Sequence, residues 1–236
     1  MISNVLKFNK NYGSSVQKYS KKDGILAIIL FIIFISLYCL TAILEREFDF
    51  INNNIIMVGN ILNLTIISIT ILFVVLNKQS IKTIGIIKGN WKKSIIIGLI
   101  LGFIFFMTNF GIDYLMYGGI FKSPQIIISL IIYYLIIAFC EEIVFRGFIQ
   151  TRMYGVIGNR LVAILIVALM FAIMHLPYRM IAYGMTLQTL VIDNFSWFIQ
   201  LVVMHIIWSF IYSKTNSIYG SIISHWVSNL AGSILT

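Results

Sequence analysis

The sequence predicts an all-α fold, a polytopic bundle of transmembrane helices with about seven spans. Of the 236 residues, 60% are hydrophobic and 11% are charged, and the mean hydropathy is +0.97. Eight acidic and seventeen basic residues cannot cover a water-soluble surface of this size without large apolar patches. The long isoleucine-rich runs lack the alternation of barrel strands, so we expect helices, which satisfy their backbone groups within the segment.

Seven apolar segments have the length of a membrane span, since about 20 residues cross the hydrocarbon core. In chain order they cover residues 24–44, 55–76, 94–112, 126–148, 161–179, 195–213 and 217–235. The first is predicted to be a retained span, because it is longer than the apolar core of a signal peptide. We expect a single transmembrane domain over residues 24–236, preceded by a basic cytoplasmic tail at residues 1–23.

The net charge of +9 is predicted to set the orientation of the spans. The basic residues lie in short clusters between apolar runs, and such clusters mark cytoplasmic loops. Because they do not line one polar face, we expect no nucleic-acid partner. Arg152 and Arg160 are also predicted to be cytoplasmic. The two main clusters contain Lys7, Lys10, Lys18, Lys21 and Lys22 before the first span, and Lys78, Lys82, Lys88, Lys92 and Lys93 before the third.

Gly98 and Gly102 form a GxxxG pattern on the third segment. This pattern allows two helices to approach closely, but it is frequent in apolar sequence. We therefore expect it to serve packing within the chain rather than dimerisation. The oligomeric state stays open at this stage.

The fourth segment carries Glu141, Glu142 and Arg146 near its end. Three charged groups facing lipid would cost about 8 kcal/mol, by summing insertion free energies of roughly 2.5 to 3.5 kcal/mol each, so they are expected to face the bundle interior. Glu142 and Arg146 are four residues apart and can pair on one helix face. Glu141 points elsewhere and is the candidate general base. The competing interpretation is an interfacial charge cluster that reaches cytoplasmic water.

The histidines favour a functional site over that alternative. All three, His175, His205 and His225, fall in predicted spans, and Asn229 shares a helix face with His225. Counting about 1.5 Å per residue from the nearest predicted cytoplasmic residue places Glu141 roughly 16 Å, His175 roughly 22 Å and His225 roughly 14 Å below that surface. Three spans can thus bring polar groups into one layer. His205 is predicted to be structural.

These residues form an ordered set of motifs: Glu141-Glu142-x-x-x-Arg146, then Phe171-x-x-x-His175, then His225-x-x-x-Asn229. The set resembles the successive motifs of the CAAX protease and bacteriocin-processing (CPBP, or Abi) family of intramembrane proteases. The resemblance covers about residues 126–236, so it implies a site formed by the C-terminal four spans. The first three spans resemble the family only in being apolar.

The resemblance implies a role for each motif residue. Glu141 and His175 would activate the attacking water, while His225 and Asn229 would stabilise the oxyanion of the tetrahedral intermediate. Glu142 and Arg146 would support that geometry. Family proteins have also been described as metalloproteases, and Glu141, His175 and His225 could bind zinc with a water as the fourth ligand. Because the sequence has no HExxH motif, we favour a mechanism without a metal cofactor.

The predicted function is an endopeptidase of the cell membrane that cuts a membrane-associated peptide or protein near the cytoplasmic face. Bacterial relatives are linked to peptide maturation and bacteriocin self-immunity, and a composition rich in isoleucine, asparagine and lysine is typical of AT-rich bacterial genomes. Two alternatives remain, a transporter with a buried Glu/Arg/His relay and a non-catalytic membrane scaffold. The absence of internal repeats counts against the transporter.

Overall fold

The computed structural model describes residues 9–86 and 90–235. Lys7 and Lys88, which belong to the predicted cytoplasmic clusters, lie outside these ranges. Within them the chain is helical, and its only β pairing is an isolated bridge between Phe121 and Leu235. The predicted all-α class is confirmed.

Six helices of the described chain are long and apolar enough to cross a membrane. They are α3 (Lys21–Glu47), α5 (Ile55–Leu76), α6 (Trp91–Phe106) with its continuation η2 (Met107–Gly111) and α7 (Ile112–Tyr117), α8 (Pro124–Glu141) with its continuation η3 (Glu142–Gln150) and α9 (Thr151–Ile157), α10 (Arg160–Ala182), and α11 (Phe195–Thr215). The shorter elements are α2 (Lys10–Val16), α4 (Asp49–Asn53), the 3-10 turn η1 (Ile81–Ile84), η4 (Thr189–Asp193) and α12 (Tyr219–Ala231).

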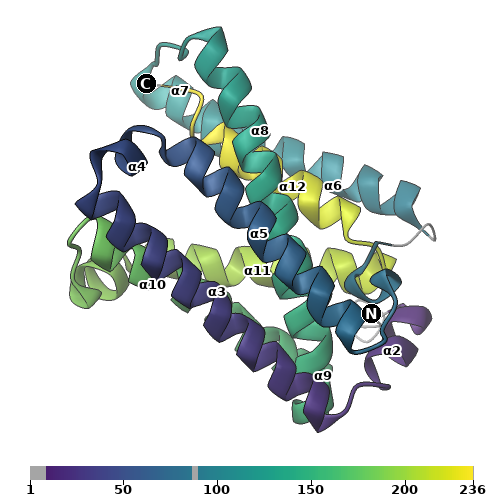
Figure 1. Ribbon diagram of the computed structural model, residues 1–236. Coiled ribbons are helices and arrows are strands. Elements are labelled where there is room, and N and C mark those ends of the chain that lie inside the picture. Colours follow the sequence, from purple (N-terminus) through teal and green to yellow (C-terminus); the bar gives the residue numbers. More distant parts are fainter. Residues whose placement is uncertain (1–8, 87–89, 236) are drawn as a thin grey trace.

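The seventh predicted segment, residues 217–235, differs from the prediction of a full span. It forms α12, a helix of 13 residues, which is about 20 Å long and too short for a hydrocarbon core of about 30 Å. Buried serines such as Ser221 and Ser224 line α12, which packs against α6, α8 and α11 (Figure 1). Helix α12 is therefore an interior element that packs against three of the six long helices.

Aromatic side chains pack η3, the continuation of α8, against α3 and α10. Phe145 of η3 makes edge-on contacts with Phe34 of α3 at 5.5 Å and with Phe171 of α10 at 5.2 Å between ring centroids. All three rings are buried. In Figure 1, α3 runs beside α10 and α5 runs beside α8. The charged end of α8 thus lies inside the bundle.

Arg152, which was predicted to be cytoplasmic, lies within a helix and is not an exposed loop residue. The side chain is fully buried in α9. Its guanidinium donates hydrogen bonds to the carbonyl of Gly147 (3.0 Å), to Gln79 Oε1 (2.5 Å) and to Thr83 Oγ1 (3.0 Å). These partners explain how the charge is accommodated, since a buried arginine must be hydrogen-bonded.

Glu141 consequently lies deeper than the sequence-based count from Arg152 suggested. The helical stretch continues to Ile157, so Glu141 is about 24 Å from that end and about 25 Å from Pro124, at about 1.5 Å per residue. By the same measure His175 is about 22 Å from the start of α10 and about 10 Å from Ala182. The candidate residues therefore belong to the membrane-embedded part of the bundle.

The GxxxG pattern packs within the chain, as predicted. A side chain carbon added at Gly98 would lie 2.7 Å from Gly220 Cα, and one at Gly102 would lie 3.3 Å from Val227 Cβ. Ser94 fixes the same contact, because its hydroxyl accepts from Gly220 N at 2.9 Å. Helix α6 therefore lies directly against α12, the helix that carries His225.

We expect Gly98→Ala to lower the free energy of unfolding by about 1 to 3 kcal/mol, as overpacking typically does. Thermal unfolding in detergent measures the effect. Gly111→Ala is the matched control, because the added carbon there would meet only Met107 at 3.5 Å. An equal change in melting temperature for both variants would contradict the close packing of α6 on α12.

Candidate active site

The charged motif lies where the α-helical geometry of α8 gives way to the π-helical segment η3. Glu141 is the last residue of α8 and Glu142 the first of η3. Exposed fractions are 5% for Glu141 and 0% for both Glu142 and Arg146. Widened π-helical turns are frequent at functional sites. The three charged side chains thus lie in the interior of the bundle, as predicted from the energetic cost of charges in lipid.

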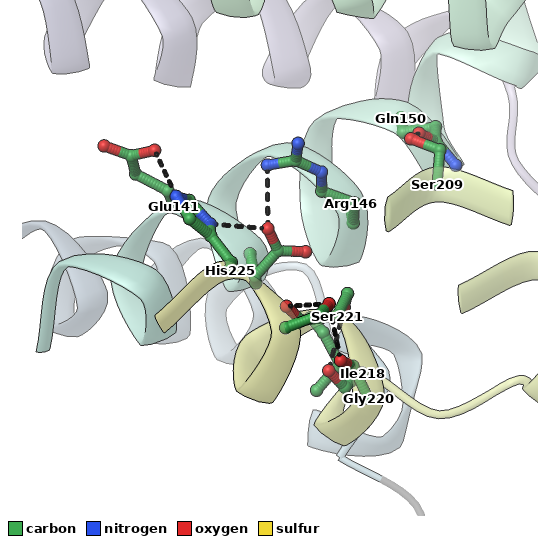
Figure 2. Close-up of polar contacts among 10 residues, drawn as sticks. Glu141, Arg146, Gln150, Ser209, Ile218, Gly220, Ser221 and His225 are labelled. Carbon is green, nitrogen blue, oxygen red and sulfur yellow. Dashed lines mark hydrogen bonds and ion pairs between the residues drawn. The ribbon is translucent and has the colours of Figure 1, made fainter. Parts of the chain in front are cut away.

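The carboxylate of Glu142 contacts two of the other motif residues, Arg146 and His225, which Figure 2 labels. Its Oε1 lies 3.0 Å from Arg146 Nη1 and 2.9 Å from His225 Nδ1. The guanidinium of Arg146 also lies over two aromatic rings, 4.4 Å from the centroid of Phe171 and 5.0 Å from that of Trp208. The predicted pair between Glu142 and Arg146 is therefore present, with His225 as a further partner.

His225 connects the two carboxylates. Its Nε2 lies 3.7 Å from Glu141 Oε2, while Nδ1 contacts Glu142 (Figure 2). The ring stacks on Trp208 with centroids 3.9 Å apart and an interplanar angle of 19°. A neutral ring that donates from Nδ1 leaves Nε2 as an acceptor, and a protonated ring donates from both nitrogens. His225 can therefore exchange a proton at the nitrogen that faces Glu141.

His175 is fixed by its own helix. Its Nδ1 lies 2.7 Å from the carbonyl of Phe171, one turn earlier on α10. Because a carbonyl only accepts, Nδ1 carries the proton and Nε2 is left as the free nitrogen. The spacing of the second motif, Phe171-x-x-x-His175, thus sets the tautomer of the histidine.

One cavity unites the four predicted catalytic residues. It has a volume of about 550 Å³ and is lined by Glu141 of α8, His175 of α10, and His225 and Asn229 of α12. Helix α11 supplies much of the remaining wall, including Trp208. The arrangement offers a base, two imidazoles and an amide donor to one bound group.

His205 is not part of this cavity lining. It is fully buried in α11, with its ring 5.3 Å from that of Phe171, and neither ring nitrogen has a hydrogen-bond partner among the described residues. Its expected structural role stays a prediction.

The sequence did not reveal Trp208, which lines the cavity, or Gln150, which is a buried polar residue of η3. Trp208 stacks on His225, and no motif or spacing marked it. Gln150 accepts a hydrogen bond from Ser209 at 2.6 Å and donates one to Tyr12 at 3.1 Å. Glu142, Arg146 and Gln150 recur every four residues in an apolar segment, so they share one helix face. That regular spacing of polar residues could have revealed Gln150.

The donors expected for zinc do not fit a metal site in this arrangement. Among residues 9–86 and 90–235, no group of three or more His, Cys, Asp and Glu side chains is placed to hold a metal ion. Glu141, His175 and His225 line one cavity without forming such a group. We derive no chemical step through a metal.

The family comparison agrees with the motifs. The family described as type II CAAX prenyl endopeptidase Rce1-like matches residues 123–231, a stretch that contains all three motifs. This region is therefore similar to the CAAX protease family that the motifs predict. The match indicates an intramembrane protease, and the six long apolar helices indicate a multi-pass membrane protein. No curated protein and no solved structure matches the chain.

Proposed function

We propose that the protein is an intramembrane endopeptidase that hydrolyses a membrane-associated peptide or protein with water activated by Glu141 and His175. One observation carries the proposal. A single cavity inside the membrane-embedded bundle is lined by Glu141, His175, His225 and Asn229. A buried carboxylate and amide donors in a water-poor cavity are the groups that peptide hydrolysis requires.

In the proposed reaction Glu141 accepts a proton from a water molecule that attacks the scissile carbonyl carbon. The free Nε2 of His175 accepts a hydrogen bond from the same water and orients it. Negative charge develops on the carbonyl oxygen, to which the Asn229 carboxamide and the protonated Nε2 of His225 donate. Glu141 then passes its proton to the leaving amine, so the base and the acid are the same group.

Glu142 and Arg146 position this machinery. The 2.9 Å contact from Glu142 to His225 Nδ1 fixes the ring that faces Glu141. Arg146, at 3.0 Å, balances the charge of Glu142. A fixed partner for the second ring nitrogen is a general means of orienting a functional histidine.

The cellular setting is also part of the proposal. The lysine clusters of the described residues support a cytoplasmic N-terminus, as the positive-inside rule expects. We place the enzyme in a bacterial cell membrane, acting in peptide maturation or bacteriocin self-immunity.

Incubation of the purified protein in lipid nanodiscs with a library of apolar bacterial peptides tests the proposal, with products identified by mass spectrometry. We expect discrete cleavage products, formed equally before and after removal of metals with a chelator. Loss of cleavage that zinc restores would overturn the glutamate mechanism. Unchanged cellular activity of a Glu141→Gln/His175→Ala variant would favour a non-catalytic scaffold.

A further inference from the structure

A second cavity meets the first at the proposed catalytic residues. It has a volume of about 430 Å³ and shares Glu141, His175 and Asn229 with the first cavity. Its other walls come from α3, α5, α8, α10 and α11. A peptide with its scissile bond at Glu141 and Asn229 therefore has space on both sides of that bond.

Arg179 is the only lysine or arginine among the described residues that line this second cavity. It follows His175 by four residues on α10, so the two side chains lie on one helix face, about 6 Å apart along the axis. The guanidinium lies 4.3 Å from the ring centroid of Trp197, and that ring is 6.3 Å from the ring of His175. Stacking on Trp197 thus holds the cation beside the reaction centre.

The charge of Arg179 is not neutralised by the neighbouring acids. Within the described residues Arg179 forms no ion pair. The carboxylate of Glu45 accepts a hydrogen bond from Tyr178, and Glu141 is the proposed base. The remaining wall is rich in tyrosine and aliphatic side chains, which carry no compensating charge. A guanidinium in such a setting favours a planar anion that it can bind through two parallel hydrogen bonds.

We infer that Arg179 is a specificity-determining residue that binds a carboxylate of the substrate, a few residues from the scissile bond. This inference rests on the proposed function. Two sources share this chemistry. The carboxylate is either the free C-terminus of a peptide or the side chain of an aspartate or glutamate. The stacked position of Arg179 beside His175 fits both.

A binding experiment on the Glu141→Gln protein in lipid nanodiscs tests the inference without requiring hydrolysis. The probes are apolar ten-residue peptides in three forms: with a free C-terminal carboxylate, with a C-terminal amide, and with the amide plus one internal glutamate. We expect at least one carboxylate form to bind about ten- to 100-fold more tightly than the plain amide, as charge-assisted hydrogen bonds do when desolvated. The form that binds identifies the source.

Adding Arg179→Gln is expected to remove this preference, whereas Arg179→Lys should retain part of it. Arg46→Gln is the charge-matched control, because Arg46 is 63% exposed and paired with Glu47. A preference that survives Arg179→Gln, or equal binding of all three peptide forms to the Glu141→Gln protein, would overturn the inference. Failure of the unmutated protein to cleave any peptide, with the Arg179-dependent preference intact, would instead refute the protease proposal alone.

Discussion

Glu141→Gln is expected to reduce kcat for peptide cleavage by about 100- to 10,000-fold, the range typical of a lost general base. The carboxamide has nearly the same size as the carboxylate but cannot take a proton from water. The fold should persist, because among the described residues the polar contact of the Glu141 carboxylate is the 3.7 Å approach to His225 Nε2. The measurement is the cleavage rate of one peptide in nanodiscs, together with the melting temperature.

Glu47→Gln is the control for this exchange. Glu47 is 57% exposed at the end of α3, so removal of its charge should leave cleavage unchanged. A Glu141→Gln protein that melts at the normal temperature and cleaves within threefold of the unmutated rate would show that Glu141 is not the base.

Arg146→Met is expected to lower the free energy of unfolding by about 3 to 5 kcal/mol, the range for removing one partner of a buried ion pair. Both Arg146 and Glu142 are completely buried. The variant would leave the Glu142 carboxylate without its cation at a site that water does not reach. Methionine keeps most of the side chain volume between Phe171 and Trp208. The decrease in the free energy of unfolding therefore measures mainly the effect of the lost charge.

The double variant Arg146→Met/Glu142→Gln separates charge from packing. It removes both charges and should recover most of the lost stability, because uncharged groups of similar volume can replace a buried pair. Cleavage should stay impaired, since His225 loses the carboxylate at Nδ1. Denaturant or thermal unfolding in detergent measures the difference. Equal stabilities of the single and double variants would contradict the ion pair.

Much of the site could be predicted because its signals are local. Charges in an apolar segment must face inward, and the four-residue spacing of Glu142 and Arg146 predicts their pairing. The ordered motifs also predicted the family match. These inferences depend on helix geometry and on the energetic cost of charge in lipid, which are the same in every helical membrane protein.

The features that escaped prediction depend on tertiary contacts. Hydropathy counts apolar residues, so it could not show that α12 is a buried helix of 13 residues rather than a span. The burial of Arg152 was not predicted, because its partners, Gln79 and Thr83, lie more than 60 residues away in the sequence. The stack of Trp208 on His225 likewise joins two helices and has no signature within either.

A double-mutant cycle of kcat/KM between Glu141→Gln and His175→Ala shows whether residues from separate helices act as one catalytic unit. Residues that act together on the same water lose activity non-additively. We predict that the double variant cleaves about as slowly as the slower single variant. Losses that multiply, or single variants that cleave at the unmutated rate, would contradict a shared site at Glu141 and His175.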